Sequence, residues 1–297
     1  TLYTVNFQAS SEMSAPSVWL ITGASRGLGF EIAKAALKAG HVVVAGRRGS
    51  QPTAQVTKLE SLGGEWIDLD MKSSDIEPII AEVEKQFGHI DVLVNNAGYG
   101  VGGTVEDLSI QTIREVMEVN VMGPIRACRA VIPVMRQQGG GTIVNISSVS
   151  GIISYPGISA YSCTKHALEG FTESLSKEIE PFKIRTILVE PGSMPTGFLD
   201  TTLSAVTAPR SEPYRGTIAD MVLSAAAGGE LVKAHGGSPV LAAARILEAV
   251  DRTGVFADRD LGLRLPLGKE TQEIIDWGKD LAKCAEELQD IALSIAV

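Results

Sequence analysis

The chain has few cysteines, few histidines and no long apolar run, and each absence excludes a class of protein. Its 297 residues include three cysteines and four histidines, with no CxxC pair and no HExxH spacing. The sequence therefore predicts neither a disulfide framework nor a metal site. No stretch approaches the ~18 consecutive apolar residues of a membrane span. Because cysteines without a disulfide pattern are typical of a reducing compartment, we expect a cytoplasmic protein.

Positive charge is also scarce. The formal net charge is −9 and no long basic run is present, which argues against nucleic acid or an anionic membrane surface as the main partner. A hydrophobic content of 44% is enough for the core of one large α/β domain. We expect a single domain over residues 13–297, preceded by a tag or flexible extension at residues 1–12.

Short apolar runs alternate with amphipathic segments from residue 18 onward. The predicted strands are 18–22, 41–46, 65–70, 90–98, 141–148, 183–192 and 261–268. The predicted helices are 27–39, 53–62, 75–87, 109–138, 155–180, 239–250 and 270–294. Continuous apolar strands joined by helices indicate a parallel sheet covered on both faces. With right-handed crossovers, this pattern predicts a three-layer α/β/α Rossmann fold with a doubly wound, seven-stranded sheet.

Two segments depart from this alternation. Residues 193–238 are rich in small and polar residues, and we expect a substrate-binding lid, with a plain surface excursion as the alternative. The last helix carries apolar residues at heptad spacing, which we interpret as a face docked on its own domain rather than a partner interface. That stripe consists of Ile274, Leu281, Leu288 and Ile295.

The stretch "TGASRGLG" (22–29) lies between the first predicted strand and the first predicted helix. Glycines in such a turn let the backbone approach a pyrophosphate, and the helix N-terminus offers free N–H groups. "GASRG" also matches a hydrolase nucleophile elbow, but that elbow normally follows several strands and here it follows the first. We expect a dinucleotide to be bound by Gly23, Ser25, Arg26, Gly27, Leu28 and Gly29.

The end of the second strand indicates which dinucleotide binds. An acidic residue there would hold the ribose 2′-hydroxyl of NAD, but "VVVAGRRGS" (42–50) places Gly46 at that point, followed by Arg47 and Arg48. An arginine pairs with a 2′-phosphate, and Arg26 could add a second contact. NADP(H) is therefore favoured over NAD(H), with Arg47 as the expected partner; the alternative is that both arginines are solvated loop residues.

Seven motifs in order carry a family resemblance: "TGASRGLG" (22–29), "LDM" (69–71), "NNAG" (95–98), "VNVMGP" (119–124), "ISS" (146–148), "YSCTK" (161–165) and "PGSMPT" (191–196). With them the sequence resembles the classical short-chain dehydrogenases/reductases, closely over residues 17–192 and more loosely beyond. "SVWLITGASRGLG" and "LRLPLG" resemble the subgroup of retinol and 17β-hydroxysteroid dehydrogenase-like enzymes, which implies a lipophilic alcohol or ketone as substrate.

The resemblance implies roles for particular residues. Ser148, with Ser147 as the neighbouring alternative, would bind the substrate oxygen, and Tyr161 would be the acid/base. Lys165 would activate Tyr161 and bind ribose, while Asn120 would anchor a water. The remaining cofactor contacts implied are Asp70 and Met71 at the adenine, Asn96 and Gly98 at the ribose, and Pro191, Gly192 and Thr196 at the nicotinamide.

Tyr161 and Lys165 are four residues apart, about one helical turn, so both lie on one helix face. A free tyrosine has a pKa of about 10, and a nearby ammonium favours its phenolate. We therefore expect Lys165, together with the positive nicotinamide of the oxidised cofactor, to move the pKa of Tyr161 toward neutral pH.

The resemblance, together with the residues after the second strand, implies an NADP(H)-dependent oxidoreductase that reduces a lipophilic ketone or aldehyde, with Tyr161 as the proton donor. Two alternatives stay open: a redox-neutral epimerisation or cyclisation on the same scaffold, and a non-catalytic NADP(H)-binding sensor. The resemblance also implies a homodimer or homotetramer formed through the helices at 109–138 and 155–180.

Overall fold

The structure is a computed structural model that describes residues 16–49, 53–196, 209–230, 233 and 236–295. Three expectations lie wholly or partly outside the described residues: the extension at residues 1–12, the start of the domain at residue 13, and the part of the lid at residues 197–208.

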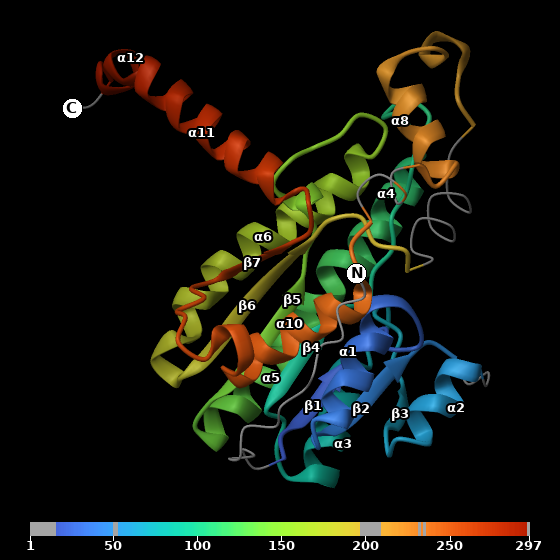
Figure 1. Ribbon diagram of the computed structural model, residues 1–297, viewed down its shortest axis with the longest axis vertical. Coiled ribbons are helices and arrows are strands. Elements are labelled where there is room, and N and C mark those ends of the chain that lie inside the picture. The colour runs from blue at the N-terminus through green and yellow to red at the C-terminus, as the bar shows by residue number, and fades with distance from the viewer. Residues whose placement is uncertain (1–15, 50–52, 197–208, 231–232, 234–235, 296–297) are drawn as a thin grey trace, which may run out of the picture.

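The sheet has seven parallel strands in the order β3-β2-β1-β4-β5-β6-β7, so the predicted fold is confirmed (Figure 1). The strands are β1 (Val18–Ile21), β2 (Val42–Arg47), β3 (Glu65–Asp68), β4 (Val92–Asn95), β5 (Gly141–Ile146), β6 (Ile184–Pro191) and β7 (Arg264–Leu267). The proline-containing β7 lies at an edge, as expected. The strand order reverses between β1 and β4, where open α/β sheets bind their ligands beyond the carboxyl ends of the strands.

Helices cover both faces of the sheet because successive strand residues point to opposite sides. On one face, Trp19 and Ile21 pack with α1 (Gly27–Lys38), α2 (Ala54–Glu60) and α10 (Pro239–Asp251). On the other, Val18 and Leu20 belong to the core that includes α3 (Ile76–Phe87), α5 (Gly123–Gln138) and α6 (Ser159–Ile179). The strands are apolar on both faces because each face is buried.

The helix expected over residues 109–138 contains a change of geometry in its middle. It runs as α4 (Ile110–Met117), a π-helical turn at Glu118–Met122, and then α5. A π turn inside an α-helix is uncommon and frequently lies at a functional site. Here it contains Asn120, which is 1% exposed.

The last helix contradicts our expectation of a docked face. Neither α11 (Thr271–Glu287) nor α12 (Gln289–Leu293) contains a buried residue, and Figure 1 shows both projecting from the body of the molecule. Leu281 is 55% exposed and Ile295 83%. A heptad pattern places apolar residues on one face but does not supply an opposing surface, which is why the interpretation was wrong. No helix in the described ranges has the length and apolar composition needed to cross a bilayer.

Part of the expected lid is described and packs on the domain. Its helix α8 (Ile218–Ala227) is capped by Thr217, whose side chain accepts a hydrogen bond from the Asp220 backbone N–H. Leu223 is buried against the loop before α6, where a Cβ atom on Gly157 would lie 2.8 Å from Leu223 Cγ. In this described part, α8 is therefore anchored to the loop that leads into the helix carrying Tyr161.

Candidate active site

The glycine turn between β1 and α1 has the tight geometry that its sequence predicts. Gly23 and Gly27 have φ angles of +65° and +60°, in the left-handed region that favours glycine. A Cβ atom on Gly23 would lie 2.7 Å from Ala97 Cα, so the loop after β4 leaves no room for a side chain there. Helix α1 starts at Gly27, which directs its free N–H groups toward the turn.

Asn96 braces this turn from the neighbouring strand. Its Nδ2 donates to the carbonyl oxygens of Thr22 and Gly23, each at 3.0 Å. A Cβ atom on Gly29 would collide with the Asn96 amide, so Gly29 provides a close approach rather than a positive φ. The amide of Asn96 is therefore committed to holding the glycine turn in place.

One cleft of about 750 Å³ brings most of the predicted site residues together. We call it the cleft, and its walls come from the glycine turn, the ends of β3 to β6, and α6. The predicted residues that line it are Gly23, Ser25, Arg26, Gly27, Leu28, Asp70, Met71, Asn96, Gly98, Ser148, Tyr161, Lys165, Pro191, Gly192 and Thr196. Gly29, Arg47 and Asn120 are not among its lining residues.

Tyr161 and Lys165 lie on the same face of α6, as their spacing predicts. The Lys165 Nζ is 5.7 Å from the centroid of the Tyr161 ring and donates to the Ile146 carbonyl oxygen at 2.8 Å. Lys165 is 6% exposed, and burial lowers its pKa to about 8, while the charge of Glu169 acts in the opposite direction. The ammonium is thus held beneath the ring by the end of β5.

Loss of solvation also determines the pKa of Tyr161. It raises the pKa of the phenol to about 12, and a hydrogen bond with Ser148 lowers it only in part. In the protein alone the pKa of Tyr161 is therefore raised, because loss of solvation outweighs the hydrogen bond with Ser148. The lowered pKa that we expect with the oxidised cofactor stays a prediction. At neutral pH the phenol holds its proton.

Ser148 and Asn120 are both fixed by backbone groups. The Ser148 hydroxyl accepts from the Ser150 backbone N–H at 3.1 Å and donates to the Pro191 carbonyl oxygen at 3.5 Å. Asn120 Nδ2 donates to the Tyr99 carbonyl oxygen at 2.8 Å and to Thr164 Oγ1 at 3.1 Å. The π turn thus ties the loop after β4 to the start of α6. Ser147, the alternative to Ser148, also lines the cleft.

The two arginines after β2 have different surroundings. The Arg47 guanidinium lies 5.1 Å from the centroid of the Trp66 ring, on the side of the sheet that carries Val43 and Ala45. Arg48, just beyond the strand, lines the cleft together with Arg26. The alternation of side chains along a strand accounts for the difference, since Arg47 is still within β2.

Sequence reasoning missed several residues of the cleft: Lys72, Tyr155, Glu270 and Glu273. Tyr155 Oη donates to Glu273 Oε2 at 2.8 Å, which joins the loop before α6 to the start of α11. Glu270 could have been identified from its place directly after the last predicted strand. The carboxyl ends of parallel strands meet at one edge of the sheet, so a residue that follows β7 is expected near the cleft. No motif marks the other residues.

The residues around the glycine turn fit an anionic dinucleotide. The turn allows close backbone approach, the N-terminus of α1 favours negative charge, and Arg26, Arg48 and Lys72 add positive charge to the same cleft. Within the described ranges, no group of three or more His, Cys, Asp or Glu side chains could hold a metal ion.

Comparison with known proteins agrees with this fold. A family model described as short chain dehydrogenase matches residues 17–206. Oxidoreductase claN of Passalora fulva is 44% identical over 213 residues, 71% of this chain and 95% of that protein. A short-chain dehydrogenase from Streptomyces avermitilis is 34% identical with a TM-score of 0.81, covering 96% of this chain and 100% of the other.

A short-chain dehydrogenase/reductase from Burkholderia phymatum, solved in complex with NAD, is 27% identical with a TM-score of 0.74. That match covers 92% of this chain and 95% of the other. The family expected from the seven motifs is confirmed by these matches. The chain belongs to the classical short-chain dehydrogenases/reductases, a family of oxidoreductases.

Proposed function

We propose that the protein is an NADP(H)-dependent oxidoreductase that reduces a lipophilic ketone or aldehyde to an alcohol, with Tyr161 as the proton donor. The observation that carries this proposal is that the glycine turn shares one cleft with Ser148, Tyr161 and Lys165. A dinucleotide bound at the turn would have its reactive ring within the same cleft as a half-buried, protonated phenol.

The protein's own groups supply the proton and the electrostatics. When bound, the nicotinamide cofactor supplies the hydride. Tyr161, whose burial raises its pKa to about 12, gives its phenolic proton to the carbonyl oxygen as that oxygen gains negative charge. The Ser148 hydroxyl donates a hydrogen bond to the same oxygen. The Lys165 ammonium beneath the ring stabilises the phenolate that remains.

The preference for NADP(H) rests on Arg26 and Arg48, since guanidinium groups bind a 2′-phosphate and the end of β2 lacks the acid that NAD favours. The complex of the Burkholderia phymatum relative with NAD supports a nicotinamide dinucleotide as ligand. For the substrate, Ile158, Met194 and Val222 add apolar surface to the cleft. A cytoplasmic location and a homo-oligomeric state remain predictions.

The test is NADPH consumption, compared with NADH, over a panel of ketones and aldehydes from small to steroid-sized. We expect NADPH oxidation that depends on a bulky apolar carbonyl. The Tyr161→Phe variant should lose about 10²–10⁴-fold in kcat, since a general acid contributes that much, while its Kd for NADPH stays within about twofold. Turnover by Tyr161→Phe at the wild-type rate would contradict the assignment of the proton donor.

Two other outcomes distinguish the alternatives. Conversion of a substrate without a change in NADPH absorbance would favour the redox-neutral reaction. Tight NADPH binding with no conversion across the panel would favour the sensor.

A further inference from the structure

Glu270 is a buried carboxylate that the proposed mechanism does not use. It lies between the end of β7 and the start of α11, is 6% exposed, and lines the cleft. Its Oε1 accepts a hydrogen bond from the Ser193 backbone N–H at 2.8 Å. Its Oε2 is buried and has no hydrogen-bond partner among the described residues. Half of this carboxylate is thus desolvated without a donor.

Two glycines form the space that the carboxylate occupies. A Cβ atom on Gly192 would collide with Glu270 Oε2, and one on Gly268 would lie 2.8 Å from it. Gly192 is also hydrogen-bonded to the end of β7, because its N–H donates to the Leu267 carbonyl oxygen at 2.8 Å. The chain therefore places a carboxylate directly against the Pro191–Gly192 backbone, with no side chain between them.

This location gives the charge a partner in the proposed reaction. Pro191 and Gly192 line the cleft, and the family resemblance implies that they border the nicotinamide ring, which carries a positive charge in the oxidised cofactor and none in the reduced one. A carboxylate shielded from water interacts more strongly with a nearby cation than a solvated one does. Burial of Glu270 costs free energy that a neighbouring positive charge would partly offset.

We propose that the negative charge of Glu270 strengthens binding of the oxidised, positively charged nicotinamide relative to binding of the reduced form. The inference rests on the proposed function, because it requires a nicotinamide cofactor beside Gly192. It also gives the reaction a direction on the enzyme: a fixed negative charge stabilises the positive charge that develops as hydride is given to the carbonyl carbon.

The experiment measures binding rather than turnover. Dissociation constants for NADP⁺ and NADPH are determined by calorimetry for the wild type and for Glu270→Gln. Glutamine keeps an oxygen that can accept from the Ser193 N–H but removes the charge. We expect the ratio of Kd(NADP⁺) to Kd(NADPH) to rise about tenfold in Glu270→Gln, the size of an interaction worth about one pKa unit, mainly through weaker NADP⁺ binding.

Two further variants isolate the charge. Glu286→Gln removes a carboxylate from the exposed surface of α11 and should leave the ratio unchanged, because solvent and salt screen it. Glu270→Asp keeps the charge and should keep the wild-type ratio even if both affinities fall. Glu270→Asp also provides the test if Glu270→Gln unfolds before it can be titrated. A ratio of Kd(NADP⁺) to Kd(NADPH) that rises in Glu270→Asp would itself overturn the proposal, because the charge is still present.

The outcomes separate this inference from the proposed function. An unchanged ratio in Glu270→Gln, with normal binding of both cofactors, would overturn the role of Glu270 and leave the oxidoreductase proposal standing. A wild type that binds neither NADP(H) nor NAD(H) would overturn both.

Discussion

Arg48 lies just beyond β2 and lines the cleft, and the proposed function makes it a partner of the 2′-phosphate of NADP(H). Replacing it with glutamate should raise Kd for NADPH about 10–100-fold, the value of a charge-assisted hydrogen bond, while Kd for NADH changes far less. The measurement is a fluorescence titration of both cofactors. Arg47→Glu is the matched variant, because the sequence alone predicts that Arg47 binds the phosphate and that this substitution weakens NADPH binding. An effect confined to Arg47→Glu would show that the stacked arginine, and not Arg48, binds the phosphate.

Lys165 is a buried cation whose place in the fold costs stability. Its pKa is lowered to about 8, so below pH 8 the folded protein holds a charge that burial disfavours. Between pH 8 and about 10.5 the unfolded chain binds more protons than the folded one, and stability should rise with pH there.

Lys165→Met should therefore increase the free energy of unfolding at pH 7 by about 1–3 kcal/mol while abolishing turnover. Urea unfolding of the variant checks this, with the exposed Lys177→Met as the control. A less stable Lys165→Met would mean that the bond to the Ile146 carbonyl oxygen outweighs the cost of burial.

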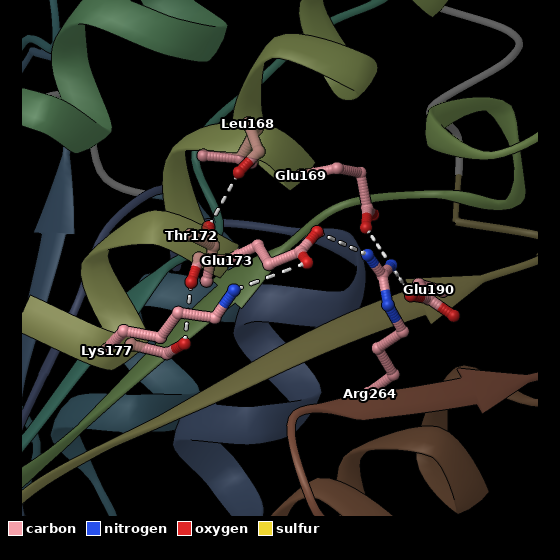
Figure 2. A network of polar contacts seen from close by, with 8 residues as sticks. Leu168, Glu169, Thr172, Glu173, Lys177, Glu190 and Arg264 are labelled. Atoms are coloured by element: carbon pink, nitrogen blue, oxygen red, sulfur yellow. Dashed lines mark hydrogen bonds and ion pairs between the residues drawn. The ribbon is translucent and has the colours of Figure 1, made fainter. Parts of the chain in front are cut away.

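At the scale of elements, a polar network joins α6, β6 and β7 behind the cleft. Figure 2 shows the Arg264 guanidinium from β7 between Glu169 of α6 and Glu190 of β6. Arg264 Nη1 pairs with Glu190 at 2.7 Å and also with Glu169, so two buried carboxylates share one cation. Burial, with a smaller contribution from the charge of Glu169, raises the pKa of Glu190 to about 7 against the opposing effect of Arg264.

The raised pKa of Glu190 makes the fold sensitive to pH. The folded protein binds a proton at Glu190 between about pH 4.5 and 7, where the unfolded chain has lost it, so this residue's contribution to stability is lost as pH rises through 7. Glu190→Gln should remove that decline, which melting temperatures at pH 5 and pH 7.5 would measure. Glu173→Gln removes an exposed carboxylate that lies 3.6 Å from Arg264 Nη2 in the same network, and it should keep the wild-type slope. If both variants lose the decline in melting temperature equally, the pH dependence comes from the whole network around Arg264 and not from the proton on Glu190.

For the molecule as a whole, periodicity and apolar content predicted the seven strands, because a parallel sheet buried on both faces needs continuous apolar runs. The ordered motifs predicted most of the cleft. What could not be predicted depends on contacts between distant segments. Glu270 reaches the cleft only because β7 lies beside β6. The apolar stripe of α11 is exposed. Its heptad pattern indicates which residues share one face of the helix, but not whether another segment of the chain covers that face.

That exposure bears on the assembly of the molecule. Leu281, Leu288 and Ile291 of the C-terminal helices are each about half exposed or more, and they expose apolar surface to water. We expect the protein to form a homodimer or homotetramer, so light scattering should give a multiple of 31.4 kDa. A single species at the monomer mass, over a range of concentrations, would contradict this.

The π turn at Glu118–Met122 has a consequence for changes in chain length. It holds one residue more than a regular helix would need between α4 and α5. Deleting one of its residues other than Asn120 would restore an unbroken α-helix and leave α4 and α5 close to their present relative orientation, because the π turn absorbs the extra residue locally. The widened turn that directs Asn120 to Tyr99 and Thr164 would be lost. Substitutions in this turn change its chemistry, whereas a single deletion removes its geometry, and that geometry is what connects the loop after β4 to α6.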